Sequence, residues 1–207
     1  IWVTGVQTCA LPIFVFVPLF MLSKLVRDSG FKVVLTGEGS DEMLGGYDIF
    51  KEAKIRRFWG QRPDSALRPM LLERLYPWSK NLQAQAPAYR QAFFHVRKED
   101  LESPFFSHLP RWDMTHKVAQ FYSGDMRAAT RGHDPYADVL AGLPEDFGRW
   151  DPFARAQWLE ATILLPGYIL SSQGDRMTLG NAVEGRFPFL DHRVIEFYME
   201  IGRASCR

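Results

Sequence analysis

The chain has 207 residues, of which 46% are hydrophobic, so it is long and apolar enough to bury a core and is not disordered by composition. Its 25 Lys and Arg residues nearly balance its 24 Asp and Glu residues, which gives a formal net charge of +1. This balance argues against a basic nucleic-acid-binding surface, and we expect no nucleic acid among the partners.

The two ends of the chain resemble the conceptual translation of sequencing-adapter DNA. We therefore expect the authentic protein to occupy residues 14–200, and we exclude residues 1–13 and 201–207 from fold reasoning. Both cysteines, Cys9 and Cys206, lie in these ends, so the remainder offers no disulfide and no cysteine-ligated metal site. This fits a reducing compartment, and we expect a cytoplasmic protein.

Excluding the ends changes two further interpretations. Leaving out Arg203 and Arg207 lowers the Lys and Arg total from 25 to 23 against 24 acidic residues, so the net charge changes from +1 to −1. Residues 1–23 carry no charge, but they contain polar residues and prolines and lack a basic n-region. We therefore expect neither a membrane span nor a signal peptide there.

In chain order, the first predicted element is a helix over residues 16–30. Pro18 suits its first turn, and Gly30 is placed to end it. One apolar face is formed by Leu19, Leu22, Leu25 and Val26. A helix that leads into a strand is typical of the second half of a βαβ crossover, and the preceding strand of that unit is absent from the sequence.

A buried parallel strand is predicted next, over residues 32–36, because this run is short, β-branched and continuously apolar after its first residue. Ligands of open α/β sheets bind beyond the carboxyl ends of strands, so the loop that follows is the candidate site. Gly37 and Gly39 allow backbone N–H groups to approach a ligand, and Glu38 and Asp41 place carboxylates beside them. This combination predicts Mg²⁺ together with phosphate rather than phosphate alone.

After the loop, the predicted elements are mainly helical. Ser40 is predicted to cap a short helix that the following Gly-Gly pair ends, and Asp48 to cap a helix through Arg57. Residues 60–110 have weak periodicity, so no helix boundaries are predicted there.

Three further helices are predicted in the second half of the chain. One amphipathic helix includes Met114, Val118, Phe121 and Tyr122. Asp151 caps a second helix, which ends at Pro166–Gly167. Asp191 begins the third, with an inner face formed by Val194, Ile195, Tyr198 and Met199. Together the elements predict one edge of an α/β layer with a helical extension.

Two separate motifs of this chain resemble the synthetase domain of the glutamine-hydrolysing asparagine synthetases. Residues 36–47 match that family's Ser/Thr-Gly-Glu-Gly-Ser-Asp-Glu segment and the Gly-Gly-Tyr that follows it. Residues 171–177 (Ser-Ser-Gln-Gly-Asp-Arg-Met) and 183–191 (Val-Glu-Gly-Arg-Phe-Pro-Phe-Leu-Asp) match a second segment in the expected order. The resemblance covers residues 14–200. It implies an α/β fold with a partial parallel sheet of the adenine-nucleotide α-hydrolase (PP-loop ATP pyrophosphatase) type and a mainly helical extension.

The resemblance also implies an activity and its partners. Family members activate the β-carboxylate of aspartate with ATP, forming β-aspartyl-AMP and pyrophosphate, and ammonia released from glutamine then attacks the acyl-adenylate. This implies a carbon–nitrogen ligase with ATP and Mg²⁺, aspartate as a substrate and a glutaminase domain on the same full-length chain. A homodimer is compatible with these expectations.

Site residues follow from the resemblance by position. Glu38 is implied as the catalytic residue, which helps form the acyl-adenylate or accepts a proton from ammonia, and Asp41 as the Mg²⁺ ligand. The residues implied to contact ATP are Thr36, Gly37, Gly39, Ser40, Asp41 and Arg176.

Structural roles stand beside these functional ones. Glu38 and Asp41 can simply cap a turn, and capping is as good an explanation for Glu42 as catalysis. Arg176 can hold a substrate carboxylate or phosphate, or it can pair with Asp175. For Glu184, Arg186 and Asp191 we favour structural roles, with Arg186 and Glu184 as a partly buried ion pair. The run from Phe187 to Leu190 is interpreted as core packing.

Several expected parts of the family pattern are absent from these residues. They include a glutaminase domain with an N-terminal cysteine, a Ser-Gly-Gly-x-Asp-Ser pyrophosphate loop and a lysine after the last helix. We therefore expect a truncated part of a longer enzyme that is inactive alone. The alternatives are a related ATP-dependent synthetase, such as a β-lactam or peptide cyclase or an enzyme that amidates another carboxylate, and a non-catalytic domain of the same fold.

Overall fold

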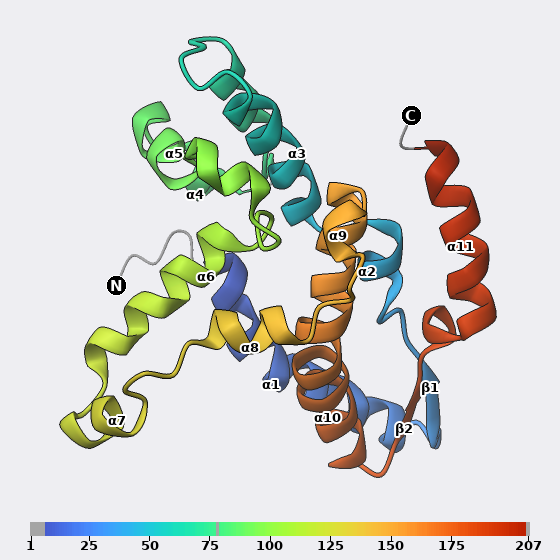
Figure 1. Cartoon of the computed structure of the whole chain (residues 1–207). Helices are drawn as coiled ribbons and strands as arrows, with labels where there is room; N and C mark the ends of the chain where they lie inside the picture. Colours follow the sequence, from blue (N-terminus) through green and yellow to red (C-terminus); the bar gives the residue numbers. More distant parts are fainter. Residues whose placement is uncertain (1–6, 78, 206–207) are drawn as a thin grey trace. The chain divides into compact units, whose positions relative to one another are not determined.

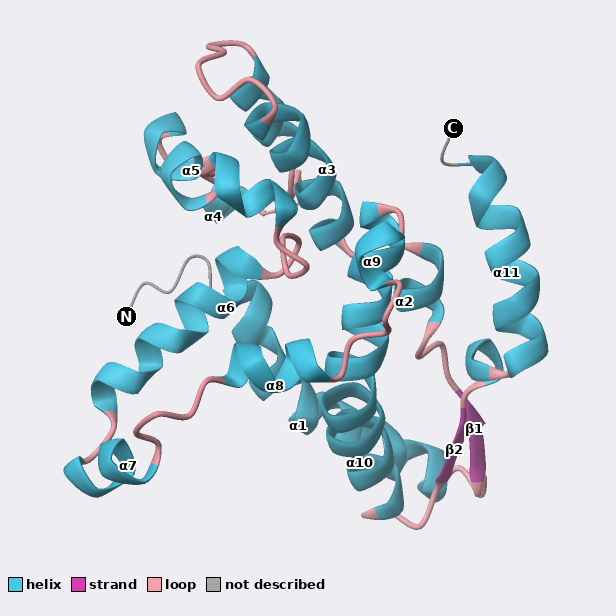
Figure 2. Cartoon of the chain, in the orientation of Figure 1, coloured by secondary structure: helices cyan, strands magenta, loops and turns pink. Residues whose placement is uncertain are grey.

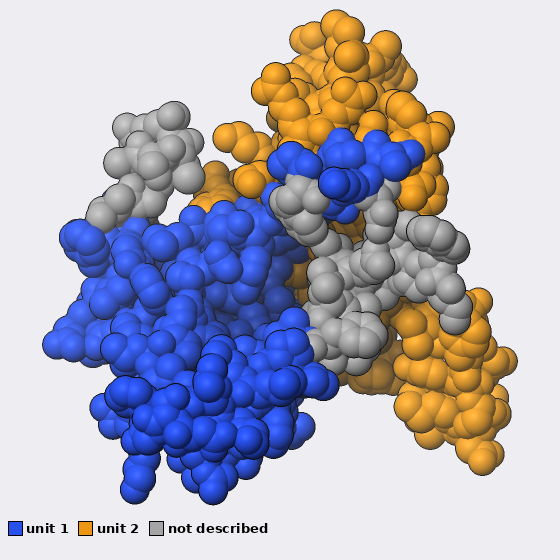
Figure 3. Space-filling model, turned by 180° about the vertical axis from the view of Figure 1, so that it is seen from behind, with its two compact units in different colours: residues 1–50, 76–84, 157–207 blue, residues 51–75, 85–156 orange. Residues whose placement is uncertain are grey.

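The computed structural model describes residues 7–77 and 79–205, so the predicted end segments lie partly outside the described residues (Figure 1). The described chain is mostly helical, with one small parallel sheet of two strands (Figure 2). It divides into two compact units, coloured separately in Figure 3: residues 1–50, 76–84 and 157–207 form the first, and residues 51–75 and 85–156 form the second. Helices α3 (Asp48–Gly60) and α9 (Pro152–Leu159) run across the unit boundaries.

The first unit contains both strands. Its elements are α1 (Gln7–Asp28), β1 (Val33–Leu35), α2 (Ser40–Leu44), α4 (Lys80–Gln83), η5 (Glu160–Asp175), α10 (Arg176–Leu179), β2 (Glu184–Arg186), η6 (Pro188–Leu190) and α11 (His192–Ser205). Helix α1 packs against α10 and η5, and α11 packs against α2 and η6.

The predicted parallel strand is present, but the expectation that it is buried was wrong. Strand β1 pairs in parallel with β2, with Val33 opposite Glu184 and Leu35 opposite Arg186. Val34 is half-buried, whereas 69% of Leu35 is exposed. Alternate side chains of a strand point to opposite faces. A parallel strand is buried on both faces only where helices cover both, and the described residues leave the face of Val33 and Leu35 uncovered.

The first helix is longer than predicted, and only part of its predicted apolar face is covered. Helix α1 begins at Gln7, so Pro18 lies inside it rather than in its first turn. Of the predicted apolar face, Leu22 and Leu25 are exposed and Leu19 and Val26 are half-buried, whereas Ser23 is buried. The Ser23 hydroxyl donates to the Met177 carbonyl at 2.7 Å, and the Asn181 amide donates to the Ser23 hydroxyl at 2.7 Å. Polar contacts therefore position α1 against α10.

The helix that Asp151 caps does not end where proline predicts. The Asp151 carboxylate accepts the backbone N–H of Phe153 at 2.8 Å, as expected of a cap. After α9, however, the chain continues as η5, a wide π-type helix with Pro166 inside it. Leu165 and Ile169 of η5 are buried, so packing overrides the local tendency of proline to end a helix.

The last helix begins as predicted. The Asp191 carboxylate accepts the Arg193 backbone N–H at 2.9 Å, and hydrogen bonding to Arg193 holds the pKa of Asp191 well below its usual value. Val194, Ile195 and Tyr198 are half-buried, but Met199 is exposed and does not belong to the inner face.

The second unit is helical. Its elements are η1 (Arg68–Arg74), α5 (Pro87–Phe93), η2 (Lys98–Glu102), α6 (Leu109–His116), η3 (Lys117–Phe121), α7 (Gly124–Ala129), α8 (Pro135–Ala141) and η4 (Phe147–Arg149). The helix predicted around Met114 is thus α6 continued by the tighter η3. Met114 and Tyr122 are half-buried, but Val118 and Phe121 are exposed, so the expected amphipathic packing was wrong for those two residues. In the described part of the chain, no helix combines the length and apolarity needed to cross a membrane.

A buried ion pair stabilises the second unit. Arg111 donates to both carboxylate oxygens of Glu52, at 2.6 and 2.9 Å, and Glu52 is almost fully buried. Replacing Arg111 with Met removes the bidentate partner of a buried carboxylate, so we expect the free energy of unfolding to fall by about 3–5 kcal/mol. Denaturant unfolding measures this, and the double variant Glu52→Gln/Arg111→Met should recover much of the loss. A single variant as stable as the wild type would contradict the prediction.

Candidate functional site

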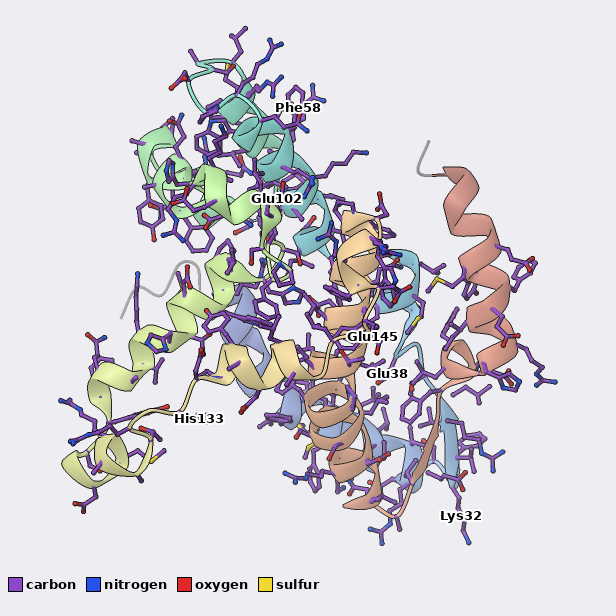
Figure 4. The ribbon with its side chains drawn as sticks, in the orientation of Figure 1. Lys32, Glu38, Phe58, Glu102, His133 and Glu145 are labelled. Atoms are coloured by element: carbon purple, nitrogen blue, oxygen red, sulfur yellow. The ribbon has the colours of Figure 1, made fainter. Side chains whose placement is uncertain are left out.

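The parallel sheet brings the two sequence motifs together. The backbone N–H of Thr36 donates to the Arg186 carbonyl at 3.0 Å, directly after β1. The loop from Thr36 to Ser40 therefore leaves the sheet beside the residues that follow β2. Glu38 lies in this loop between β1 and α2, at the opposite end of β1 from Lys32 (Figure 4). The loop residues thus lie beyond the carboxyl end of β1, where the sequence places the candidate site.

The two motifs pack closely against each other at Gly39. It has a φ of +93°, which side-chain-bearing residues rarely adopt, and it precedes α2 as its N-cap. A Cβ at this position would lie 2.7 Å from Cγ of Leu190, in the second motif. Both the backbone conformation and the packing therefore require glycine here. Ser40 is the first residue of α2, so the expectation that its side chain caps the helix was wrong.

The Gly-Gly-Tyr segment shapes the end of α2. Gly45 ends the helix in the left-handed conformation, with φ of +73°, as predicted. Gly46 donates its N–H to the Asp41 carbonyl at 2.9 Å, and a Cβ on Gly46 would lie 2.9 Å from Cγ of Asp41. The second glycine therefore leaves room for the Asp41 carboxylate, which is exposed on α2.

Buried polar contacts hold α2 from inside. The Tyr47 hydroxyl donates to the Glu42 carboxylate at 2.8 Å, and only 1% of Glu42 is exposed. The Gln157 amide donates to the backbone carbonyls of Glu42 and Met43, at 3.3 and 2.7 Å. Burial raises the pKa of Glu42, and the nearby carboxylates of Asp41 and Glu160 raise it further. Sequence reasoning identified neither the Tyr47 contact nor the Gln157 contact.

The raised pKa of Glu42 predicts a pH-dependent stability. A carboxyl with a raised folded-state pKa contributes stability that is fully present below its unfolded pKa, near ~4.3, and that is lost as the pH rises through the folded value. We therefore expect Glu42→Gln to melt a few degrees above the wild type at pH 7, with the difference vanishing toward pH 4. Thermal melts from pH 4 to 8 measure this, with Glu196→Gln, an exposed site on α11, as the control. A constant difference across the range would contradict the assignment.

Two buried polar atoms of the loop lack partners. Thr36 Oγ1 and Glu38 Oε2 are buried, and neither has a hydrogen-bond partner among the described residues. Buried polar atoms are normally hydrogen-bonded, so two in one short loop point to a ligand that supplies the missing contacts. Gly37 is exposed, and a Cβ on it would touch nothing within 4 Å. The loop thus presents a hydroxyl, a carboxylate and an accessible backbone on one segment.

The remaining predicted residues lie apart from this loop. Arg176 is exposed at the start of α10, and no hydrogen bond or ion pair joins it to the described loop residues. The predicted pair of Arg186 with Glu184 exists, at 2.8 Å. Its side chains are each 59% exposed, so the expectation of a partly buried pair was wrong. The run from Phe187 to Leu190 was expected in the core, but Pro188 is exposed and the other three residues are half-buried, with Phe189 stacked on Tyr198.

The carboxylates do not form a complete metal site. No group of three or more His, Cys, Asp or Glu side chains could hold a metal among the described residues. Magnesium differs from other metals in keeping several waters and binding through one or two carboxylates plus substrate phosphates. The exposed Asp41 carboxylate, four residues after the exposed Gly37, fits that mode better than an all-protein metal centre.

Comparisons with known proteins agree with the two motifs. The sequence model of the asparagine synthase family matches residues 13–204. The chain is 31% identical to the putative glutamine-hydrolysing asparagine synthetase of Mycobacterium tuberculosis over 86% of this chain and 25% of the relative. It is 28% identical to amidase chry2 of Gibberella zeae over 85% of this chain and 26% of the relative. It is 24% identical to asparagine synthetase 1 of Bacillus subtilis over 89% of this chain and 27% of the relative. No solved structure gives a significant match.

Proposed function

Because the chain belongs to the asparagine synthase family, we propose that it forms the adenylating part of an enzyme that makes asparagine from aspartate, ATP and glutamine-derived ammonia. The chain spans about a quarter of the length of the curated relatives that it matches. The proposal therefore concerns the whole enzyme, with a glutaminase domain supplying ammonia. The parallel sheet supports a fold of the PP-loop ATP pyrophosphatase type.

One observation carries the proposal. Two motifs separated by more than a hundred residues meet at the carboxyl end of the strand pair, where Thr36 Oγ1 and Glu38 Oε2 are buried without partners among the described residues. A nucleotide and an acyl group bound over this loop would supply acceptors and donors to both atoms.

The loop residues would divide the chemistry by position. Thr36, Gly37, Gly39 and Ser40 would contact ATP, mainly through the backbone N–H groups and hydroxyls. Glu38 would face the aspartate carboxylate and accept a proton from ammonia as the amide bond forms. Release of AMP would then complete transfer of the acyl group from phosphate to nitrogen.

Magnesium would be held by Asp41 together with phosphate oxygens, and when bound it would neutralise negative charge on the leaving pyrophosphate. Arg176 would contribute a guanidinium to the nucleotide or to the substrate carboxylate. In the described chain, no hydrogen bond or ion pair joins Arg176 on α10 to the Thr36–Ser40 loop. A bound nucleotide would therefore have to contact both the Arg176 side chain and the loop.

A second class of substrate, a carboxylate other than that of aspartate, also has support. The relative from Gibberella zeae is named an amidase. The loop residues are proposed to contact ATP, and every carboxylate-activating ligase of this family would use ATP, so these residues do not identify the carboxylate substrate. An enzyme that amidates a carboxylate other than that of aspartate is therefore the alternative function.

The test is ATP–pyrophosphate exchange in the full-length protein that carries this chain. Exchange that depends on aspartate and on Mg²⁺ is the expected result. Exchange that depends on another carboxylic acid and not on aspartate would favour the alternative. Absence of exchange with every carboxylate tested would refute the proposal and favour a non-catalytic domain.

A further inference from the structure

The second unit contains a partly open cavity that the proposed function does not use. Its volume is about 290 Å³, close to the lower end of the range for small-molecule pockets. Apolar walls come from Phe93, Leu109 and Met114, and the charged groups of the lining are Arg56, Arg97, Lys117, Asp100 and Asp113. All of these residues belong to the second unit, so the cavity is independent of the Thr36–Ser40 loop.

Arg56 is the unusual member of the lining. Only 1% of this residue is exposed, and its guanidinium carbon lies 4.6 Å from the centre of the Phe106 ring. One terminal nitrogen donates to the Phe106 carbonyl at 2.8 Å. Its Nε is buried and has no hydrogen-bond partner among the described residues. Burying a charged group with an unused donor is unfavourable unless an acceptor completes it.

The acidic groups nearby are already engaged. Arg97 donates to both carboxylate oxygens of Asp100, at 2.7 and 3.2 Å, and Tyr136 donates to Asp113 at 3.1 Å. Glu52 forms its bidentate pair with Arg111. No acidic side chain is hydrogen-bonded to Arg56 in the described part of the second unit.

Lys117 adds a second cation. It is exposed at the start of η3, lines the same cavity, and has no ion-pair partner among the described residues. The cavity therefore combines the buried Arg56 guanidinium and the exposed Lys117 ammonium with apolar walls. The carboxylates of its lining, Asp100 and Asp113, are hydrogen-bonded to Arg97 and Tyr136. A carboxylate is planar, and its two oxygens match the donor geometry of a guanidinium. An apolar group attached to that carboxylate would contact Phe93, Leu109 and Met114.

We propose that this cavity binds a small organic carboxylate whose apolar part is about the size of a phenyl ring. The carboxylate accepts from Arg56 Nε and approaches the Lys117 ammonium, while the apolar part lies between α5 and α6. No group is transferred, so the site is one of binding and not of chemistry. It would place a second small-molecule site in the same chain as the proposed ligase loop.

The test uses phenylacetate as the probe and phenylacetamide as its neutral isostere, titrated calorimetrically into the 207-residue chain. We expect saturable binding of phenylacetate at one site and binding of the amide weaker by about tenfold or more, because a charge-assisted hydrogen bond is lost. Equal affinity for the acid and the amide, or no saturable binding of phenylacetate, would overturn the proposal. Inorganic phosphate binding in place of phenylacetate would also overturn it.

Matched variants locate the binding. Ala92→Trp fills the cavity from α5 and should abolish binding, whereas Ala88→Trp, one turn earlier on that helix, should leave it unchanged. Lys117→Gln should weaken binding several-fold, whereas Lys98→Gln, an exposed lysine outside the lining, should not. Arg56→Met should remove binding. If that variant fails to fold, the Ala92 and Lys117 pairs still decide the outcome, and insensitivity of binding to Ala92→Trp places the ligand elsewhere.

Discussion

Glu38→Gln is expected to lower the rate of asparagine formation from aspartate, ATP and ammonia by about a hundred- to ten-thousand-fold in the full-length enzyme, the range in which positioned acid–base groups contribute. The variant keeps the size of the side chain and removes its charge. Because Glu38 Oε2 is buried without a partner among the described residues, removing that charge is not expected to destabilise the fold. Activity and stability should therefore separate, with asparagine formation lost and the melting temperature unchanged or raised.

The control for Glu38 is an acidic residue in the same unit that lies outside the loop. Glu196 is exposed on α11, and Glu196→Gln should leave asparagine formation and melting temperature unchanged. Asparagine formation by Glu38→Gln within a few-fold of the wild type would remove Glu38 from the reaction. A large fall in melting temperature would instead assign Glu38 the structural role of capping the turn.

Gly39→Ala is expected to be the most damaging small substitution in the first unit. A Cβ must be accommodated at a φ of +93°, and it collides with the Leu190 side chain. Backbone strain of this kind is worth about 1–3 kcal/mol, and overpacking adds a similar amount. Denaturant unfolding should show the loss of stability, and exchange should fall with it because the loop must shift to relieve the contact.

A double variant separates the two causes. Leu190→Ala removes the collision but leaves the backbone conformation, so Gly39→Ala should cost about 1 kcal/mol less in that background. Gly37→Ala is the matched comparison, because no atom lies within 4 Å of its added Cβ and its φ is not positive. It should keep its stability. If Gly39→Ala proves as stable as Gly37→Ala, the close packing of Leu190 against the loop is wrong.

Local sequence signals predicted the elements of the site well. A short β-branched run before Gly37 predicted a strand ending in a loop, and β1 ends at Leu35. The glycine pair predicted the end of α2, and Asp151 and Asp191 predicted helix starts that their backbone hydrogen bonds confirm. Each of these features depends on residues a few positions apart, so propensity and hydrogen-bonding geometry are enough to specify them.

Burial was predicted less well, because it depends on what covers a residue. Leu35 and Leu22 carry apolar patterns typical of a core, yet both are exposed in the described structure. Ser23, by contrast, is buried through contacts with Met177 and Asn181, which lie more than a hundred residues later. A hydrophobic pattern identifies a face that can pack, but it does not name the partner or guarantee one.

The sequence by itself determined the family, the loop that carries Glu38 and Asp41, and the need for glycine around them, since these follow from motifs and local backbone chemistry. Only the tertiary structure decided that Leu190 packs on Gly39, that Gln157 supports α2, and that Arg56 keeps an unused donor beside a cavity. Those contacts join residues from about 50 to 150 positions apart, and only the packed chain specifies which distant side chains meet.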